Sequence, residues 1–315
     1  MSKEKIGVID LGTNTFHLLI AELNTTGFKT VFKEKTTVKI GQGGISAGFI
    51  THDAFERAIT AMDNFKNIIE EYRIKRVYAT ATSAVRNASN GKLMVETIKA
   101  RTGIEVKIID GDQEANYIYQ GVSAALNLGS DTSMIMDIGG GSVEFIICND
   151  YEILWKKSFE IGAQRLLDKF HAQDPMPSSS RKKLYEYLEQ NLKPLSKAIK
   201  EFQPKILVGC SGTFDTLCEI YNKEQGIDLD LESETECDLP IDAYLAIHEE
   251  IISKIRAERL KIPGMIELRV DMVVVASCLI KFVLQNYPIS KIRVSSYALK
   301  EGILNLLVKN KQVTL

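Results

Sequence analysis

The sequence predicts an α/β protein that contains two copies of one domain. A hairpin motif occurs at residues 9–20 and again at 136–147, an offset of 127 residues. A strand that runs into a Ser/Thr-rich turn occurs at 76–84 and again at 205–213, an offset of 129. Segments with helical spacing of apolar residues lie between these motifs in both halves. Because the offsets nearly agree, a duplicated domain explains both repeats.

Each hairpin motif is an apolar strand that ends in aspartate, followed by glycine and hydroxyl residues and then a second apolar run. Glycines let backbone N–H groups approach an anion, hydroxyls add donors, and the aspartate can hold a divalent cation. Two such loops facing each other would bind a phosphate chain from both sides. The residues that would do so are Asp10, Gly12, Thr13, Asn14 and Thr15 in the first copy and Asp137, Gly139, Gly140, Gly141 and Ser142 in the second.

The remaining elements follow in the same order in both halves. Residues 28–32 and 151–155 match as third strands. A helix is expected from Thr51 to Tyr72, with Thr51 or Asp53 as its N-cap, and its counterpart covers 184–195 after a loop at 174–180. The segment from Tyr297 to Val308 reads as a helix that could return to the first domain.

These elements predict two domains. The first would span residues 1–124 together with a C-terminal helix at about 298–315, and the second would span 125–297. Each half is long enough to bury a core of its own.

Composition and charge narrow the class of protein. A hydrophobic content of 45% and a charged content of 25% are ordinary for a soluble globular chain. The formal net charge of -2 argues against a large nucleic-acid surface, which needs many Lys and Arg contacts to phosphate. The longest uncharged apolar stretch, 272–280, is too short to span a bilayer, and the N-terminus shows no signal segment. We therefore expect a cytoplasmic protein without nucleic-acid or membrane partners. The sequence leaves the oligomeric state open, and a symmetric homodimer is one option for a protein of this size.

Cysteines and the acidic stretch carry no assigned chemistry. The five cysteines show no C-x-x-C spacing and are expected to be buried thiols rather than disulfides. Residues 228–238 hold many carboxylates but lack the glycine and ligand spacing of a calcium loop, so a solvated loop is expected.

Glu114 is the main candidate outside the hairpins. A strand ends at Asp110, Asp112 is the expected N-cap, and Glu114 falls in the first turn of the next helix. The carboxylate could complement the helix dipole, or it could act as a general base that deprotonates water. The residues alone leave both readings open.

Basic and hydroxyl residues at the turns form a further group of candidates. Guanidinium groups placed by such turns suit phosphate recognition. This group comprises Ser83, Arg86, Arg165, Ser211, Gly212 and Thr213, with Lys300 as a weaker candidate. Walker-type, zincin and G-x-S-x-G patterns are absent from the sequence.

Together these motifs resemble the Ppx/GppA phosphatases, a family of exopolyphosphatases and guanosine pentaphosphate phosphohydrolases. The resemblance covers nearly the whole chain and rests on signatures in the family's order. They are 8–15, 82–88, 113–115, 137–144, 209–213, 259–271 and 299–302. Lys300 departs from the pattern, because many relatives carry Arg there, and this would weaken a bidentate phosphate contact.

The resemblance implies a fold and a reaction. The fold would be a duplicated ribonuclease H-like one of the actin-like ATPase and sugar kinase superfamily, with a cleft between its two domains. The reaction would be Mg²⁺-dependent hydrolysis of a terminal phosphoanhydride in polyphosphate or guanosine pentaphosphate. By this resemblance Glu114 is the catalytic base, Asp137 and Glu144 hold Mg²⁺ or position water, with Asp10 as a further metal ligand, and the first loop binds phosphate.

Two alternatives remain. One is a sugar kinase or ATPase of the same superfamily, which would transfer phosphate to an acceptor other than water. The other is a phosphate or alarmone sensor without catalysis. The presence of Glu114, Asp137 and Glu144 together favours the hydrolase.

Overall fold

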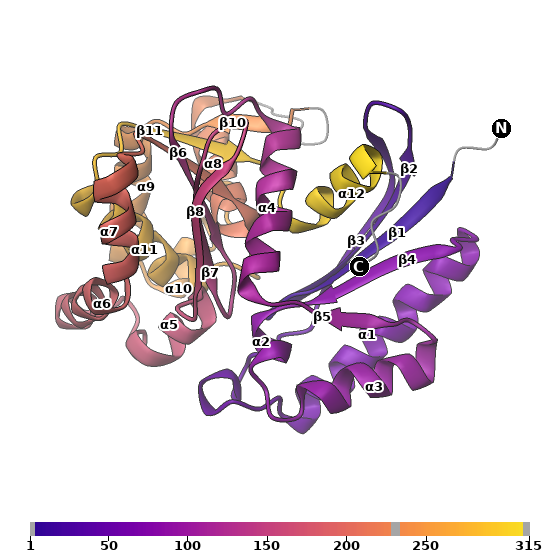
Figure 1. Ribbon diagram of the computed structural model, residues 1–315. Coiled ribbons are helices and arrows are strands. Elements are labelled where there is room, and N and C mark those ends of the chain that lie inside the picture. Colours follow the sequence, from indigo (N-terminus) through magenta and orange to yellow (C-terminus); the bar gives the residue numbers. More distant parts are fainter. Residues whose placement is uncertain (1–3, 228–233, 311–315) are drawn as a thin grey trace. The chain divides into compact units, whose positions relative to one another are not determined.

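The computed structural model describes residues 4–227 and 234–310. The chain divides into two compact units (Figure 1). The first consists of Met1–Gly121 and Leu299–Leu315, and the second of Val122–Ala298. Within the described residues, no helix is both long and apolar enough to cross a membrane.

The first unit is built on a five-stranded sheet with the order β3-β2-β1-β4-β5. Its first three strands are antiparallel neighbours, and β4 and β5 run parallel to β1. The strands are β1 (Lys5–Leu11), β2 (Thr15–Leu23), β3 (Phe28–Thr37), β4 (Arg76–Ala81) and β5 (Val106–Ile108). The helices are η1 (Ile45–Ala47), α1 (His52–Glu71), α2 (Ser83–Arg86), α3 (Gly91–Thr102), α4 (Gly111–Ala125, whose last residues belong to the second unit) and α12 (Leu299–Asn310).

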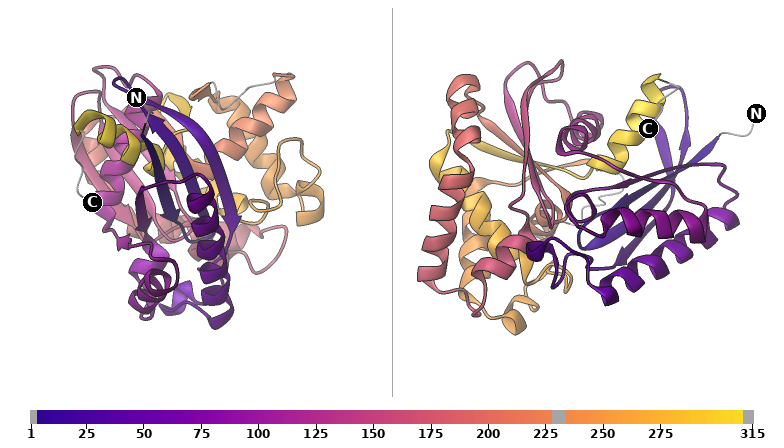
Figure 2. Two further views of the ribbon diagram at one scale, coloured as in Figure 1. Left: turned by 90° about the vertical axis from the view of Figure 1, so that its right-hand side faces the viewer. Right: turned by 60° about the horizontal axis from the view of Figure 1, so that its bottom comes forward.

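Strand alternation decides which residues of β1 enter the main core of the first unit. Ile9 and Leu11 pack with the apolar stripe of α1, which includes Met62 and Phe65. Figure 2 shows α1 and α3 side by side along the sheet. Because successive side chains point to opposite faces, Asp10 lies on the other face, where α12 contacts the sheet. The two-residue alternation that buries Ile9 and Leu11 in the core therefore also places Asp10 on the opposite face of the sheet.

The second unit is built on a six-stranded sheet with the order β10-β11-β9-β6-β7-β8. Strands β6, β7 and β8 are antiparallel neighbours, and β9 runs parallel to β6, as β4 does to β1. The strands are β6 (Ser133–Ile138), β7 (Val143–Cys148), β8 (Ile153–Phe159), β9 (Ile206–Cys210), β10 (Glu236–Asp238) and β11 (Lys291–Ser295). The helices are α5 (Ala163–Phe170), α6 (Ser178–Asn191), α7 (Lys193–Phe202), α8 (Ser211–Gln225), α9 (Ile241–Ser253), α10 (Arg256–Arg259) and α11 (Met272–Asn286).

The predicted α/β class is confirmed. Both sheets are mixed, and they repeat one strand order around their hairpins. The Thr51 cap is also confirmed, since its side chain accepts a hydrogen bond from Ala54 N at 3.4 Å. One predicted helix is wrong in detail, because residues 184–195 belong to two helices, α6 and α7, that meet at Leu192. Pro194 lies in the first turn of α7, where its missing N–H costs no helical hydrogen bond.

The cysteine prediction is wrong for one pair. Cys218 on α8 and Cys237 on β10 form a disulfide, whereas Cys148, Cys210 and Cys278 are buried free thiols, as expected. Six residues of the acidic stretch, 228–233, lie outside the described residues, as do 311–315 of the expected C-terminal helix.

Candidate functional site

Residues 38–41 hold the tip of the first hairpin through hydrogen bonds to its carbonyl groups. The backbone N–H groups of Val38 and Lys39 both donate to Asn14 O, at 3.0 and 2.9 Å, and Gly41 N donates to Thr13 O at 3.1 Å. A trans peptide group points its N–H opposite to its C=O. The N–H groups of Asn14 and Thr15 therefore point away from residues 38–41.

The second hairpin uses the same arrangement with a helix behind it. The amides of the N-cap residue Gly162 and of the first two residues of α5, Ala163 and Gln164, donate to the carbonyls of Gly141, Gly139 and Gly140 at 2.9 to 3.1 Å. Helix α5 lacks a side-chain N-cap, so the hairpin carbonyls satisfy its terminal amides. By peptide geometry, the N–H groups of residues 140–142 point away from α5. Amides that point to one side in this way are a kind of backbone arrangement that can bind anions.

Two glycines, Gly162 and Gly41, allow these close contacts behind the hairpins because neither carries a Cβ. A Cβ on Gly162 would lie 2.4 Å from the carbonyl carbons of Gly140 and Gly141, and a Cβ on Gly41 would lie 2.4 Å from Thr13 Cγ2. Arg165, predicted to bind phosphate, donates from Nε to Gly141 O at 2.9 Å and pairs with Glu160. Its guanidinium thus adjoins the second hairpin and helps to hold it.

Asp137 and Glu144 face each other across the second hairpin. They are register partners on β6 and β7, so their side chains leave the same face of the sheet. Both are buried, and Ser158 Oγ on β8 donates to Glu144 Oε1 at 2.6 Å. Ser158 was not predicted from the sequence. Its role depends on the register of the third strand, which the sequence did not specify.

In the first hairpin the corresponding register partners are Asp10 and His17. Where the second hairpin has two carboxylates, the first has a carboxylate and an imidazole. His17 Nε2 lies 3.0 Å from Thr15 Oγ1, so the imidazole contacts a loop hydroxyl. The two copies therefore differ in charge at equivalent positions.

Asp10 is an unusual carboxylate. Burial raises its pKa from 3.8 to about 6, the nearby Lys300 ammonium opposes that rise, and Glu301 adds to it. Asp10 Oδ1 is buried and has no hydrogen-bond partner among the residues that the structure describes. An oxygen of this kind suits a water molecule or a hydrated cation.

Glu114 is buried at the start of α4 and pairs with Arg86. Arg86 Nη1 donates to Glu114 Oε2 at 2.8 Å and to Ile109 O at 3.0 Å, which fixes the carboxylate. The expected N-cap was wrong by two residues, because Asp110 Oδ1 accepts from Gln113 N at 2.7 Å. Two predicted site residues, Glu114 and Arg86, are thus brought together within the first unit.

The turn at Ser211-Gly212-Thr213 begins α8. Ser211 has a φ of +67°, which is costly for a residue with a side chain. The Arg269 guanidinium packs directly on Gly212, since a Cβ there would lie 1.8 Å from Nη2. Burial lowers the pKa of Arg269, while Asp215 and Asp137 oppose that shift. Arg269 lies within a sequence signature, but its role beside this turn was not predicted.

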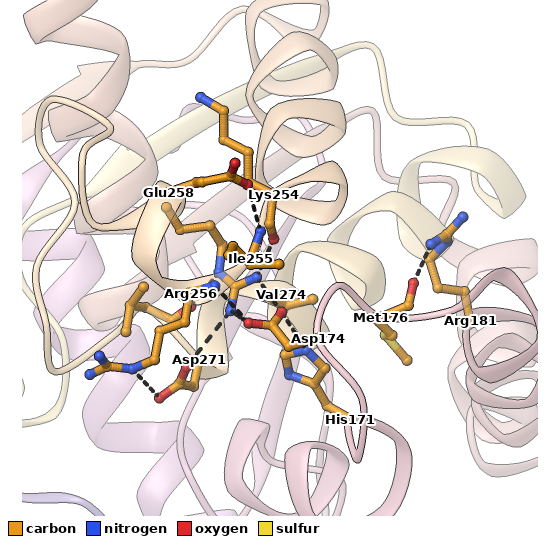
Figure 3. A network of polar contacts seen from close by, with 12 residues as sticks. His171, Asp174, Met176, Arg181, Lys254, Ile255, Arg256, Glu258, Asp271 and Val274 are labelled. Atoms are coloured by element: carbon orange, nitrogen blue, oxygen red, sulfur yellow. Dashed lines mark hydrogen bonds and ion pairs between the residues drawn. The ribbon is translucent and has the colours of Figure 1, made fainter.

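An ion-pair network lies close to this part of the second unit. Arg259 is fully buried and donates to Asp174 Oδ1 at 2.7 Å, to Asp174 Oδ2 at 3.2 Å and to two backbone carbonyls. Asp271 lies 3.7 Å from it and 3.3 Å from Arg256. Figure 3 shows Asp174 between His171 and the Arg256 segment. Burial lowers the pKa of His171, and its Nε2 lies 3.3 Å from Asp174 Oδ1.

This network anchors the segment that carries Arg269. Residues 256–271 contact α8 at two points, because Gly264, with a φ of +89°, packs on the Glu219–Ile220 peptide and Arg269 packs on Gly212. The buried ion pair at Arg259 therefore helps to place the Arg269 guanidinium beside the α8 turn.

The donor set suits Mg²⁺ bound together with substrate. Among the described residues, no group of three or more His, Cys, Asp or Glu side chains could hold a metal ion. Mg²⁺ usually binds one or two carboxylates and keeps several waters and phosphate oxygens as further ligands. The opposed pair of Asp137 and Glu144 provides such carboxylates.

Most of the remaining polar candidates, which carry hydroxyl or amide side chains, are buried. Their low exposure, below 10%, is unusual for polar side chains. They are Thr13, Asn14, Thr15, Ser83, Ser142 and Thr213.

Comparison with known proteins identifies two kinds of relative, namely solved structures and longer curated proteins. Over 97% of its length the chain resembles a solved exopolyphosphatase from Cytophaga hutchinsonii, with 47% identity, a TM-score of 0.94 and 98% of that chain covered. A solved Aquifex aeolicus PPX-GPPA enzyme is 25% identical, with a TM-score of 0.78 over 96% of this chain and 99% of that one.

Two curated proteins are longer than this chain. A guanosine-5'-triphosphate,3'-diphosphate pyrophosphatase from Pseudoalteromonas translucida is 25% identical over 302 residues, or 96% of this chain and 59% of that protein. A bifunctional 3-dehydroquinate synthase/phosphatase from Fusobacterium nucleatum is 32% identical over 232 residues, or 70% of this chain and 34% of that protein. The chain thus matches only part of each. The model of the Ppx/GppA phosphatase family matches residues 19–311, and the chain belongs to that family.

Proposed function

We propose that this protein hydrolyses a terminal phosphoanhydride and releases inorganic phosphate from polyphosphate, guanosine pentaphosphate or both. The observation that carries the proposal is the pair of hairpins whose carbonyls are bonded from behind and whose amides are aligned for an anion. Relatives with the names exopolyphosphatase and guanosine-5'-triphosphate,3'-diphosphate pyrophosphatase support this choice of substrates.

In the proposed reaction the hairpin amides bind phosphoryl oxygens and stabilise the charge that develops on the transferred group. The amides of residues 14 and 15 and those of 140–142 make these contacts. Because their carbonyls are already bonded, the amides need no rearrangement when substrate binds. This preorganisation is the main contribution of the backbone.

Glu114 acts as the general base in this proposal. The carboxylate accepts a proton from the water that attacks phosphorus, and the bridging oxygen leaves with the shortened phosphate chain. Arg86 holds the carboxylate through the 2.8 Å bond, so that one orientation is maintained. Arg86 also brings a positive charge close to the attacked group.

Asp137 and Glu144 would hold Mg²⁺, together with water and phosphate oxygens as its further ligands. When bound, the cation neutralises phosphate charge and polarises the bond that is broken. Ser158 keeps Glu144 in place through its 2.6 Å hydrogen bond.

The test is phosphate release from polyphosphate and from guanosine pentaphosphate, measured side by side with Mg²⁺ and with a chelator. Glu114→Gln should lower kcat by roughly 10² to 10⁴. Asp112→Asn, which changes an exposed acid in the same helical turn, should keep the wild-type rate.

Three results would contradict the proposal. Wild-type turnover in Glu114→Gln would show that this carboxylate is not the base. Phosphate transfer to a sugar without release of inorganic phosphate would indicate a kinase. Binding of substrate without turnover under any divalent cation would indicate a sensor.

A further inference from the structure

Strand register places three polar residues in one row across the first sheet. Asp10 on β1 pairs with His17 on β2, and His17 pairs in turn with Lys35 on β3. Directly paired residues point their side chains to the same face of a sheet. The three side chains therefore leave the face that α12 contacts, opposite to the apolar core that the sheet forms with α1.

The second sheet shows what a third-strand residue can do in such a row. There the corresponding row is Asp137, Glu144 and Ser158, and Ser158 on the third strand donates to Glu144 Oε1 at 2.6 Å. In the first sheet the second-strand position carries an imidazole instead of a carboxylate, and the third-strand position carries an ammonium instead of a hydroxyl. The first row therefore has one carboxylate fewer and one positive charge more, a composition that suits an anion rather than a cation.

Lys35 lies close to the hydroxyl of the first hairpin loop. Thr15 pairs with Thr37, so Lys35, two residues earlier on the same strand, is the diagonal neighbour of Thr15. Residues in diagonal positions lie about 7 to 8 Å apart, a separation that a long side chain can span. His17 is adjacent to both, and its Nε2 lies 3.0 Å from Thr15 Oγ1. The register thus brings the lysine within reach of a hydroxyl predicted to bind phosphate.

The row becomes more exposed toward the edge of the sheet. Asp10 Oδ1 is buried, His17 is half-buried, and Lys35 is exposed on the edge strand β3. An exposed lysine on an edge strand can also serve only to prevent pairing with another chain. Lys33 has that setting on the same face of β3, but it pairs with Leu19 and lies farther from Thr15. The two lysines therefore separate a binding role from a general one.

We propose that Lys35 is a substrate-binding residue of the first hairpin, whose ammonium pairs with a phosphoryl oxygen on the face that carries Thr15 and His17. The ligand is a polyanionic phosphate chain. The inference rests on the proposed function and deepens it, because it adds a side-chain charge to a loop that otherwise offers amides and hydroxyls. A phosphate group that accepts from the Thr15 hydroxyl is also within reach of Lys35 along the diagonal.

The experiment measures binding of inorganic tripolyphosphate by titration calorimetry in the Glu114→Gln background, so that turnover does not interfere. Lys35→Gln removes the charge from an exposed position and should raise Kd about five- to tenfold at low salt. Lys35→Arg keeps the charge and should stay within about twofold of the parent. At high salt the difference between the parent and Lys35→Gln should shrink, because salt screens exposed charges.

Lys33→Gln is the matched control, because it removes an exposed charge from the same face of the same strand. It should leave Kd nearly unchanged. An equal rise in Kd in Lys33→Gln and Lys35→Gln would indicate a general effect of charge and would overturn the assignment of Lys35. Both variants should keep the melting temperature of the parent, whereas a purely structural role for Lys35 would lower the melting temperature and leave Kd the same.

A double-mutant cycle tests whether Lys35 and Thr15 bind the same phosphate group. Thr15→Val removes the hydroxyl and keeps a β-branched side chain in the strand. If one phosphate group contacts both residues, Lys35→Gln should raise Kd less in the Thr15→Val protein than in the parent. Strictly additive effects would contradict the shared contact.

The two proposals fail in different ways. Unchanged Kd in Lys35→Gln at low salt, or no tripolyphosphate binding by the parent protein, overturns the assignment of Lys35. Normal tripolyphosphate binding with the expected Lys35 effect, but no phosphate release by the wild type, overturns only the proposed hydrolysis.

Discussion

Asp174→Asn should destabilise the second unit strongly, because it leaves the Arg259 charge without its main partner. The Arg259 side chain has an exposed fraction of 0%, and Asp174 binds it through both carboxylate oxygens, at 2.7 and 3.2 Å. Removal of one partner of a buried pair costs about 3 to 5 kcal/mol. Since the Asp174 side chain is 31% exposed, solvent screening favours the lower end, about 3 kcal/mol.

That free energy predicts a shift in melting temperature. For a unit of this size, 1 kcal/mol corresponds to about 2 to 4 °C, so the variant should melt about 6 to 12 °C lower. Differential scanning calorimetry of the full chain at pH 7 measures the shift. Glu267→Gln is the control, since it removes an exposed ion pair with Arg256 and should change the melting temperature by less than about 2 °C.

The pH dependence provides an independent check. Burial alone would raise the pKa of Asp174, but hydrogen bonds from Arg259 and from the Arg256 backbone N–H outweigh it and lower the pKa. A carboxylate with a lowered pKa stabilises the folded state above its ordinary pKa of 3.8, and this contribution is lost as the pH falls through the lowered value. The difference between wild type and Asp174→Asn should therefore narrow at acid pH. A shift below about 2 °C at pH 7 would refute the reasoning.

Three further predictions follow from other contacts. Gly302→Ala should lower the free energy of unfolding by about 1 to 3 kcal/mol, because a Cβ would lie 1.7 Å from Tyr117 O; an unchanged thermal melt would contradict the close approach. Ser158→Ala should raise the Mg²⁺ concentration for half-maximal phosphate release about tenfold, since it releases Glu144, and an identical Mg²⁺ titration would argue against this support. Burial raises the pKa of Asp10 from 3.8 to about 6. Between these two values Asp10 keeps its proton in the folded protein but has lost it in the unfolded chain. The free energy of unfolding should therefore fall as the pH rises from about 4 to 6 and then stay level. Asp10→Asn should remove this fall and, with chelator present, add up to about 3 kcal/mol at pH 8 by chemical denaturation, whereas parallel pH profiles would contradict the burial of the charge.

Repeated sequence patterns predicted the fold and part of the site. The hairpins were predictable because glycine and aspartate at strand ends are local signals, and their register then pairs Asp137 with Glu144. Strand alternation likewise explains why Asp10 leaves the core face of β1.

Other features depend on contacts that local patterns do not encode. Ser158 reaches Glu144 only through the register of β7 and β8, and the Cys218 disulfide requires that α8 and β10 lie close together. The left-handed backbone of Lys39, which has a φ of +50°, could not be predicted from the sequence, because lysine is not a residue that favours this conformation. In each case tertiary contacts, rather than propensity, decide the outcome.

The amide-lined hairpins have a consequence for how mutants of this protein are interpreted. If these backbone amides bind phosphate as proposed, replacement of the loop side chains is a poor probe, since the N–H of residue 14 or 141 survives nearly every substitution. The informative positions lie behind the loops, at Gly41 and Gly162, where an added methyl group would meet Thr13 Cγ2 or the Gly140 and Gly141 carbonyl carbons at 2.4 Å. An alanine scan confined to the polar side chains would therefore underestimate this site, and replacements at these two glycines would reveal it.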